Sequence, residues 1–359
     1  MSKYAFNESE LNVKGYVPNR NRPDEPGKPI LDFPCTAKEA TNAMYRREAV
    51  WVPYGVETNI FCPEIIPDNI ARGFVLGAES KNYSPETYGG KDMFGVEWVF
   101  VPVAGGSMEK PGNPHPLGDD VSGWKEKLTF PDIDSWDWDK SARDNEAWLD
   151  NGKANIFWFL NGMGFERLIS FMGFEGAAMA MLDEDQEDDL KDLLESLTDL
   201  HIKLVDKVCE TYGDAIDGFT LHDDWGSQRS PFFSEECAET FLVPQMKRFT
   251  DHVKSKGKFA DLHSCGHIED RIACIINGGW QSWSPMPMND TLKLQEEYGD
   301  KIIIGCVPNY DPEKSVEENA ADFVKKYYRP DRPCTISNYG GAVLSEAFAK
   351  AVYKLSRQM

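Results

Sequence analysis

The sequence predicts an α/β fold, a (β/α)8 TIM barrel with an N-terminal elaboration. Strand-like and helix-like segments alternate from residue 154 to the end of the chain, which is the pattern of a parallel sheet. Polar motifs follow nearly every strand-like segment: NGMGFE, HDDWG, HSCG, WSPM, GCVPN and SNYGG. A barrel collects its active site from the C-terminal ends of many strands, whereas an open doubly wound sheet binds its ligand at one switch point. These motifs therefore favour the barrel.

The N-terminal part of the chain has a different character. Its first 30 or so residues are polar and proline-rich, and we expect an arm draped over the protein. Thr36 and Glu39 have the spacing of a capping box and predict a helix in TAKEATNAMYRREA. The alternating segment DMFGVEWVFVPV predicts a strand in a hairpin. We expect residues 1–359 to form a single barrel domain, in which residues 1–150 partly roof the barrel mouth and residues 151–359 form the regular strand–helix repeats.

The regular part is predicted element by element from its apolar and amphipathic segments. The predicted strands lie within residues 154–162, 215–224, 258–265, 279–286, 301–309 and 333–341. The predicted helices lie within residues 165–182, 183–213, 234–257, 267–278, 290–299, 315–328 and 345–356. The acidic start of the segment 183–213 suits a helix N-terminus. The motif NGMGFE lacks the third glycine of a dinucleotide-binding fingerprint, so we reject that cofactor.

Composition and charge exclude several classes of function. The net charge of −22 argues against nucleic-acid binding, because no basic stripe is present to neutralise phosphates. No apolar run approaches the roughly 20 residues of a membrane helix. The eight cysteines are scattered, which favours reduced thiols or metal ligands over a disulfide framework. We expect a soluble cytoplasmic protein, and the sequence gives no prediction of its oligomeric state.

His263 and Cys265 are candidate metal ligands. They stand two positions apart at a strand end, and residues i and i+2 of a strand point the same way. Cys306 ends a later strand, which in a barrel lies on the same face. One imidazole and two thiolates suit a catalytic Zn²⁺ site with one open position. Cys334 starts its strand and should lie at the opposite face, Glu236 is an alternative fourth ligand, and the alternative to any metal is a buried cysteine beside a hydrogen-bonded histidine.

A group of acids and a histidine ends two other strands. His222, Asp223 and Asp224 follow one strand, and Glu166 follows another. Burying a carboxylate costs several kcal/mol unless it is paired. We therefore expect these residues to organise substrate and metal, or else to form a salt-bridge network with an arginine such as Arg167 or Arg229.

From about residue 36 onward the chain resembles the uroporphyrinogen decarboxylase superfamily. DLHSCG, GCVPNYDP and TISNYGG stand where that superfamily carries its late strand-end motifs, and DMFGVEW and LHDDWGSQ resemble the methyltransferase I components of anaerobic O-demethylase systems. The chain lacks the arginine-rich N-terminal signature of the decarboxylases. It has Gly340 where the decarboxylases have a histidine and the thiol methyltransferases a cysteine, so Cys306 is the natural substitute ligand.

The resemblance implies a zinc-dependent methyltransferase. It would move a methyl group from a methoxylated aromatic to the Co(I) of a separate corrinoid protein, with zinc on His263, Cys265 and Cys306. His222, Asp223, Asp224 or Glu166 would orient the substrate or move a proton. The residues expected to bind the aromatic substrate are Phe94, Trp98, Trp225, Asn338 and Tyr339.

Three other functions stay open at this point. The first is a corrinoid-dependent thiol or methylamine methyltransferase, and the second is a uroporphyrinogen decarboxylase-like enzyme. The third is a non-catalytic protein that binds a corrinoid or tetrapyrrole. Asp261 to Gly266 matches the D-x-H-x-x-G pattern in which His263 would bind cobalt directly, but that assignment would break the barrel.

Overall fold

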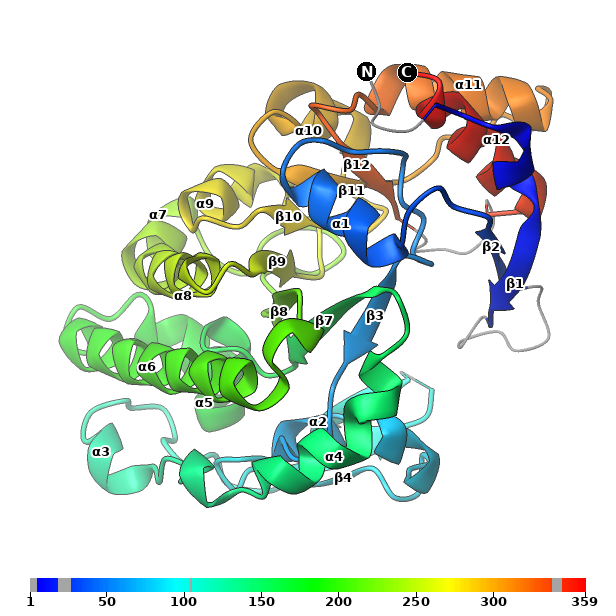
Figure 1. Cartoon of the computed structure of the whole chain (residues 1–359). Coiled ribbons are helices and arrows are strands. Elements are labelled where there is room, and N and C mark those ends of the chain that lie inside the picture. Colours follow the sequence, from blue (N-terminus) through cyan, green and yellow to red (C-terminus); the bar gives the residue numbers. More distant parts are fainter. Residues whose placement is uncertain (1–4, 19–26, 104, 338–343) are drawn as a thin grey trace. The chain divides into compact units, whose positions relative to one another are not determined.

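The computed structural model describes residues 5–18, 27–103, 105–337 and 344–359 (Figure 1). In this part of the chain the principal sheet has the strand order β12-β11-β10-β9-β8-β7-β3. Its strands are β3 (Thr58–Phe61), β7 (Ala154–Phe159), β8 (Gly218–His222), β9 (Phe259–His263), β10 (Ser282–Trp283), β11 (Ile303–Cys306) and β12 (Cys334–Ile336). The predicted α/β class is confirmed as a TIM-barrel-like fold, although the described residues supply seven strands and not eight.

The chain forms two compact units. Unit 1 contains residues 1–59, 152–154 and 281–359, and unit 2 contains residues 60–151 and 155–280. Glu166, His222, Asp224, His263 and Cys265, which form the candidate site described below, belong to unit 2. Each unit is therefore described by itself.

In unit 2, strands β7, β8 and β9 are parallel and in register. Phe159 pairs with Leu221, and His222 pairs with His263. The principal helices of this unit are α4 (Trp138–Leu149), α5 (Phe165–Ala180), α6 (Glu187–Tyr212), α8 (Val243–Ser255) and α9 (Ile272–Asn277). Helix α5 is interrupted at Gly173, whose φ of 73° lies in the left-handed region. The register places the ends of β8 and β9 level with each other.

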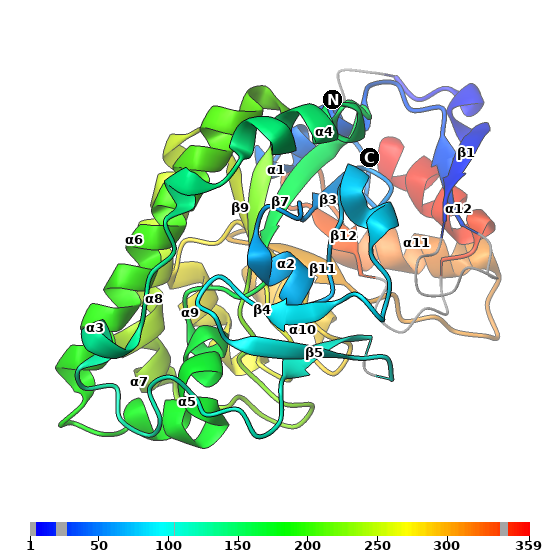
Figure 2. The ribbon, with the colours of Figure 1, turned by 90° about the horizontal axis from the view of Figure 1, so that it is seen from below.

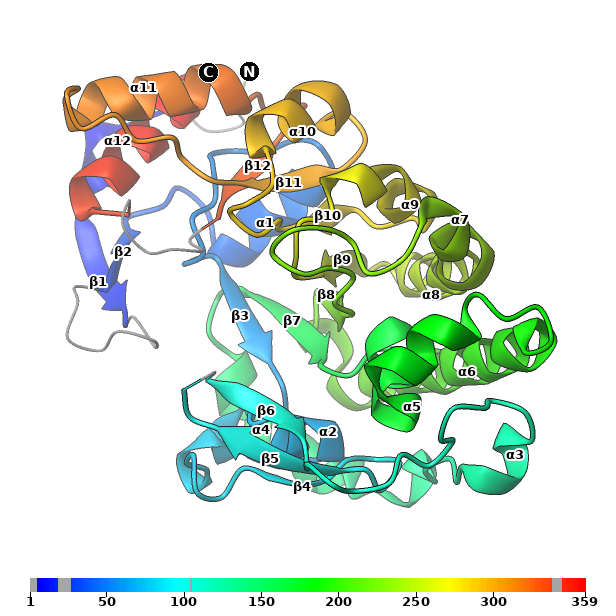
Figure 3. The same cartoon turned by 180° about the vertical axis from the view of Figure 1, so that it is seen from behind.

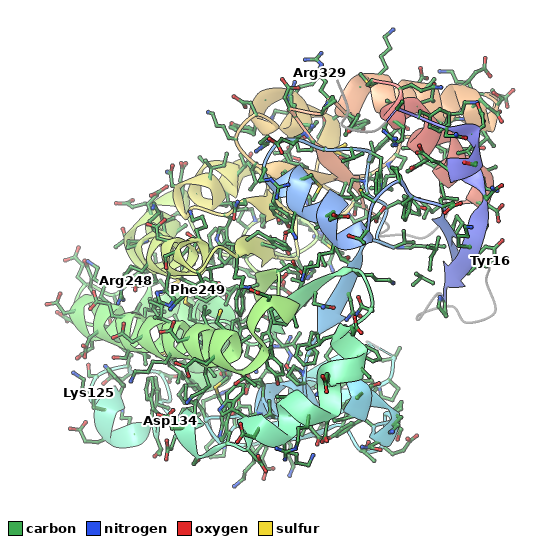
Figure 4. The ribbon with its side chains drawn as sticks, viewed as in Figure 1. Tyr16, Lys125, Asp134, Arg248, Phe249 and Arg329 are labelled. Atoms are coloured by element: carbon green, nitrogen blue, oxygen red, sulfur yellow. The ribbon has the colours of Figure 1, made fainter. Side chains whose placement is uncertain are left out.

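Alternation along β7 to β9 separates a packed face from a polar one. The rings of Phe159 and Phe219 stack at 5.9 Å, and Phe159 also meets the edges of His201 on α6 and Phe249 on α8. Helices α6 and α8 therefore cover this face (Figure 2). Figure 4 labels Phe249 together with Arg248, whose guanidinium pairs with Asp199 at the surface. The opposite face carries Trp158, Thr220, His222, Asp261 and His263.

A second sheet in unit 2 contains the predicted hairpin. Strand β5 (Glu97–Val101) pairs antiparallel with both β4 (Gly89–Lys91) and β6 (Gly106–Glu109), which confirms a strand in DMFGVEWVFVPV (Figure 3). Helix α2 (Pro67–Ala71) contacts β4 and β5. The shorter elements are η2 (Ala78–Asn82), α3 (Trp124–Lys127), η3 (Ile133–Ser135), η4 (Gly213–Ala215), α7 (Glu235–Cys237), the π-helical η5 (Ala238–Leu242) and η6 (Glu269–Arg271).

Unit 1 contains the N-terminal segment and the last strand–helix repeats. Its helices are η1 (Glu8–Leu11), α1 (Ala37–Tyr45), α10 (Thr291–Tyr298), α11 (Val316–Tyr327) and α12 (Glu346–Arg357). The predicted capping box is present, since Thr36 accepts the backbone N–H of Glu39 at 3.1 Å and the Glu39 carboxylate accepts that of Thr36 at 2.9 Å. Strands β10, β11 and β12 pair in parallel.

The N-terminal segment has more structure than the arm expected from its composition. Strands β1 (Val13–Val17) and β2 (Lys28–Leu31) form an antiparallel pair. The buried carboxylate of Glu10 accepts hydrogen bonds from Tyr353 at 2.6 Å and from Arg357 at 2.9 Å on α12. These two hydrogen bonds attach the N-terminal segment to α12, and the local sequence around Glu10 does not predict them.

Candidate metal centre

Two histidines face each other at the ends of neighbouring strands. His222 is the last residue of β8 and His263 the last of β9, and the parallel register sets them opposite each other. Their rings stack with centroids 4.6 Å apart and an angle of 16° between the planes. The ring of Trp158 from β7 lies 5.5 Å from that of His263. Three adjacent strands thus build one wall of the centre.

Asp224 completes a set of three possible metal ligands. One ligand atom from each of His222, Asp224 and His263 lies within 4.8 Å of the other two. Oδ1 of Asp224 stands 3.8 Å from Nε2 of His222 and accepts the backbone N–H of Cys265 at 2.7 Å. Sγ of Cys265 lies 3.4 Å from Nε2 of His263. The strand ends therefore bring nitrogen, oxygen and sulfur donors together.

These donors fit a zinc ion. Imidazole nitrogen, carboxylate oxygen and thiolate sulfur are the common ligand types of Zn²⁺ in proteins. Burial lowers the pKa of His263 to about 3, so its ring is neutral, which is the form in which histidine binds a metal. Burial and the neighbouring Asp224 raise the pKa of the Cys265 thiol. A cation beside this thiol would favour the thiolate.

Glu166 supports the centre from the first turn of α5. Its carboxylate is hydrogen-bonded to Nδ1 of His222, and Arg72 donates to its Oε1 at 3.3 Å. Burial alone would raise the pKa of Glu166, but the charges of His222 and Arg72 outweigh it and lower this pKa to about 2. Burial alone would lower the pKa of His222, but the Glu166 carboxylate outweighs burial and raises this pKa. Glu166 is therefore an anion paired on both sides.

Asp223 has a different role from its neighbour Asp224. Its carboxylate accepts the backbone N–H groups of Phe165 at 3.1 Å and Glu166 at 2.8 Å, and the indole N–H of Trp225 at 2.7 Å. It thus caps α5, where a helix leaves N–H groups unpaired. Gly164 leaves room for this, since a Cβ there would lie 2.2 Å from Asp223 Oδ2. Asp223 joins the end of β8 to the start of α5.

The structure brings together most of the residues that the sequence singled out. Glu166, His222, Asp224, His263 and Cys265 form one centre. The sequence also allowed a salt-bridge network with an arginine such as Arg167 or Arg229. The arginine that pairs with Glu166 is Arg72. Arg167 pairs with Asp68 and Asp92, and Arg229 is exposed.

The other predicted ligands are Cys306 and Glu236. Cys306 ends β11 in unit 1, where its thiol is buried and in hydrogen-bond contact with Cys334 of β12. Burial, first, and then Cys334 raise the pKa of Cys306. These contacts give no support to a ligand role for Cys306, which stays a prediction. Glu236, the alternative fourth ligand, is exposed on α7.

The predicted substrate-binding residues have mixed surroundings. Trp98 lies under Arg72, whose guanidinium is 4.9 Å from the centroid of the Trp98 ring. Phe94 packs edge-on against Phe130 and Phe171. Trp225 is fully buried and donates to Asp223. Asn338 and Tyr339 lie outside the described residues.

Sequence reasoning missed two residues of the centre, Arg72 and Asn161. Arg72 is the C-cap of α2, and it donates to the side-chain oxygen of Asn161 as well as to Glu166. Asn161 follows β7 in the motif NGMGFE, so its position at a strand end was a usable signal. Arg72 stands in the segment IARGF, which carries no such signal.

The fold is similar to that of a solved protein. A methyltransferase from Methanosarcina mazei matches 90% of this chain and 98% of its own, with 14% sequence identity and a TM-score of 0.60. At this identity the likeness establishes a shared fold. Dispersin B matches 62% of this chain and 75% of its own with 9% identity, and its TM-score of 0.25 supports no conclusion. The sequence matches no protein-family model and no curated protein. Among the described residues, no helix combines the length and apolar character needed to cross a membrane.

Proposed function

We propose that this protein is a zinc-dependent methyltransferase. It would move a methyl group from a methoxylated aromatic to the Co(I) of a separate corrinoid protein. The observation that carries the proposal is the convergence of His222, Asp224 and His263 within 4.8 Å at the strand ends. The fold shared with a methyltransferase and the resemblance of DMFGVEW and LHDDWGSQ to O-demethylase components support it.

The zinc ion would be held by His222, Asp224 and His263, with Cys265 as a further ligand beside them. When bound, zinc supplies a Lewis acid that stabilises the negative charge developing on an ether oxygen as its methyl group departs. The set of His263, Cys265 and Cys306 expected from the sequence is the alternative. It shares His263 and Cys265, so variants of Asp224 and Cys306 separate the two sets.

The protein's own residues would bind the substrate beside the metal. Trp98 is buried beneath the Arg72 guanidinium, 4.9 Å from it, and stays a proposed substrate contact. Trp158, whose ring lies 5.5 Å from that of His263, offers an aromatic face beside the centre. Aromatic rings pack favourably on such a face. Asn338, Tyr339, Phe94 and Trp225 stay proposed substrate contacts. The corrinoid would be carried by a partner protein.

A thiol or methylamine methyltransferase is the second candidate, and the same metal centre supports it. In a thiol methyltransferase, zinc would activate a thiolate that accepts the methyl group from a methylated corrinoid protein. In a methylamine methyltransferase, the amine would donate its methyl group to the corrinoid. The aromatic substrate is favoured here because Trp158 and Trp98 lie near the centre, whereas a small amine needs no such rings. A non-catalytic corrinoid-binding protein would need no metal at all.

The proposal is tested by metal analysis and a methyl-transfer assay. Purified protein is assayed for zinc, then for methylation of free Co(I) cobalamin by methoxyarenes and methylamines, and for methyl transfer from methylcobalamin to thiols. We expect about one zinc per chain and transfer from methoxyarenes. His263→Ala should lose both, while His252→Ala, which removes a surface histidine paired with Asp206, should keep both. Transfer to thiols or from methylamines alone would establish the second candidate, and zinc-free wild-type protein would contradict the proposal.

A further inference from the structure

A chain of hydrogen bonds runs from His222 through Glu166 to Arg72 and Asn161. We infer that Glu166 is a positioning residue that fixes which ring nitrogen of His222 faces the metal centre, and that Arg72 acts through Glu166. The inference rests on the proposed zinc function and deepens it, because it assigns the residues that prepare the site for its metal.

The two ring nitrogens of His222 have different neighbours. Nδ1 faces the Glu166 carboxylate, and Nε2 faces Oδ1 of Asp224 at 3.8 Å. A carboxylate only accepts hydrogen bonds, so Nδ1 must carry the hydrogen. When the ring gives up its other proton on binding a metal, the lone pair is then on Nε2, on the side of Asp224 and His263. Histidine ligands of metals are commonly set in this way by a carboxylate on the other nitrogen.

Glu166 is itself held on three sides. Its backbone N–H is bound by Asp223, one carboxylate oxygen is bound by His222, and the other accepts from Arg72. Its side chain is 13% exposed. One carboxylate oxygen therefore faces His222 and the other faces Arg72. Its geometry is that of a residue acting through His222.

Arg72 ties this carboxylate to the end of β7. One guanidinium nitrogen donates to Glu166 and another to the side-chain oxygen of Asn161. Asn161 is 1% exposed, and its backbone carbonyl accepts from Arg167 at 3.3 Å, which fixes its position. A planar guanidinium can make both contacts at once, whereas a lysine ammonium is a point charge without that fork. Arg72 therefore constrains the direction of Glu166 as well as supplying charge.

The test compares zinc affinities of metal-stripped variants by competition with a chromophoric chelator. Glu166→Gln should weaken zinc binding by about 10- to 100-fold, the range for lost partners of metal-bound histidines. Glu175→Gln, an exposed position on the same helix, should bind zinc as the wild type does. Arg72→Lys keeps the charge and should weaken zinc binding in the same direction but less. The visible spectrum of the cobalt(II)-substituted protein should change in Glu166→Gln and not in Glu175→Gln.

A double variant separates action through Glu166 from an independent effect of Arg72. If Arg72 acts through Glu166, the variant Arg72→Lys with Glu166→Gln binds zinc no more weakly than Glu166→Gln alone, because coupled residues are not additive. Additive losses would overturn the role of Arg72. Unchanged affinity in Glu166→Gln, with a wild type that binds zinc, would overturn the role of Glu166.

The two proposals fail in different ways. A wild type that binds zinc but transfers no methyl group refutes the proposed function, and the affinity series still decides the positioning role. Loss of structure is recognised separately, because thermal unfolding of each variant is measured with zinc removed. Should Glu166→Gln fail to fold, Glu166→Asp, which keeps the charge but shortens the side chain, takes its place and is expected to weaken zinc binding likewise.

Discussion

The carboxylate of Asp223 accepts the backbone N–H of Glu166 at 2.8 Å, although the two residues are 57 positions apart in the chain. This contact locks the end of β8 to the start of α5. The neighbouring Asp224 belongs instead to the candidate metal centre, where its Oδ1 accepts the backbone N–H of Cys265. Two consecutive acids are thereby given separate tasks.

We predict that Asp223→Asn and Asp224→Asn affect different properties. Asp223→Asn should lower the free energy of unfolding by about 1–3 kcal/mol, because its amide group cannot accept all three N–H donors. Asp224→Asn should fold normally and lose at least roughly tenfold in turnover, about 1.4 kcal/mol of barrier. Urea unfolding and the methyl-transfer assay measure the two effects. Wild-type turnover in both variants would show that the pair is purely structural.

The thiol of Cys265 provides a direct test of the metal centre. We expect Cys265→Ala to lose zinc and activity while it keeps its fold, because a chain of this size does not depend on a metal to close its core. Zinc content by atomic absorption, turnover and thermal unfolding are measured on the same preparation. Cys274→Ala is the matched control, since this buried cysteine belongs to α9 and not to the centre. Full zinc retention in Cys265→Ala would remove the thiol from the ligand set.

The sequence predicted the regular part of the fold well because its signals are local. Apolar runs such as ANIFWF and IIIGC mark buried parallel strands, and the Thr36–Glu39 spacing marks a helix start. Strand β3 escaped prediction because TNIF is short and lies in an aromatic, proline-rich region. Strands β1 and β2 were not predicted because the N-terminal segment is polar. The burial of Glu10 in that segment depends on Tyr353 and Arg357 of α12, which are distant in sequence.

The sequence singled out most residues of the candidate site but did not show which of them contact one another. Barrel active sites lie at the C-terminal ends of strands, and this rule alone groups His222, Asp224, His263 and Cys265. Their roles depend on register and direction: His222 stacks on His263 because β8 and β9 pair at that level. Arg72 comes from a helix outside the repeats, and no local pattern connects it with Glu166.

A comparison of Cys306 and Cys334 decides the alternative ligand set. The two thiols share one buried contact in unit 1, so we expect Cys306→Ser and Cys334→Ser to retain zinc. Each should lose about 1–3 kcal/mol of stability, because a hydroxyl replaces a thiol in an apolar surrounding. Zinc content and urea unfolding are measured for both. A sharp loss of zinc in Cys306→Ser alone would return Cys306 to the ligand set.

The N-terminal segment should make stability depend on pH through Glu10. Burial alone would raise the pKa of Glu10, but hydrogen bonds from Arg357 and Tyr353 outweigh it and hold the pKa below its usual 4.5. The stabilisation is therefore complete above the unfolded pKa and is lost as the pH falls through the folded pKa. Glu10→Gln should cost about 1.5–3 kcal/mol near neutral pH and flatten this acid-side loss. Urea unfolding at several pH values measures both effects.

The matched control for this pH effect is Glu8→Gln. Glu8 pairs with Lys354, but its side chain is 67% exposed, so its replacement should change stability by no more than about 0.5 kcal/mol. An equal loss in both variants would mean that the segment contributes through general charge and not through the Glu10–Arg357 pair.

The most buried ion cluster of unit 2 yields the last prediction. The Arg167 guanidinium pairs with both Asp68 and Asp92, and none of the three side chains is more than 1% exposed. Removal of one member of such a cluster leaves uncompensated buried charge, which typically costs about 3–5 kcal/mol. We therefore expect Arg167→Met to lose that much unfolding free energy. Arg248→Met, which breaks a surface pair with Asp199, should lose less than about 1 kcal/mol.

A triple variant distinguishes the charge effect from packing. In Arg167→Met combined with Asp68→Asn and Asp92→Asn, no buried charge is left without a partner, so much of the lost stability should return. Asp92 also accepts the indole N–H of Trp98 at 3.2 Å and Asp68 the backbone N–H of Met93 at 2.9 Å, and the asparagine side-chain oxygens can keep these bonds. If the triple variant is no more stable than Arg167→Met, the cost comes from the guanidinium's packing against Phe94 and Phe171, and the buried charges are not what makes Arg167 necessary.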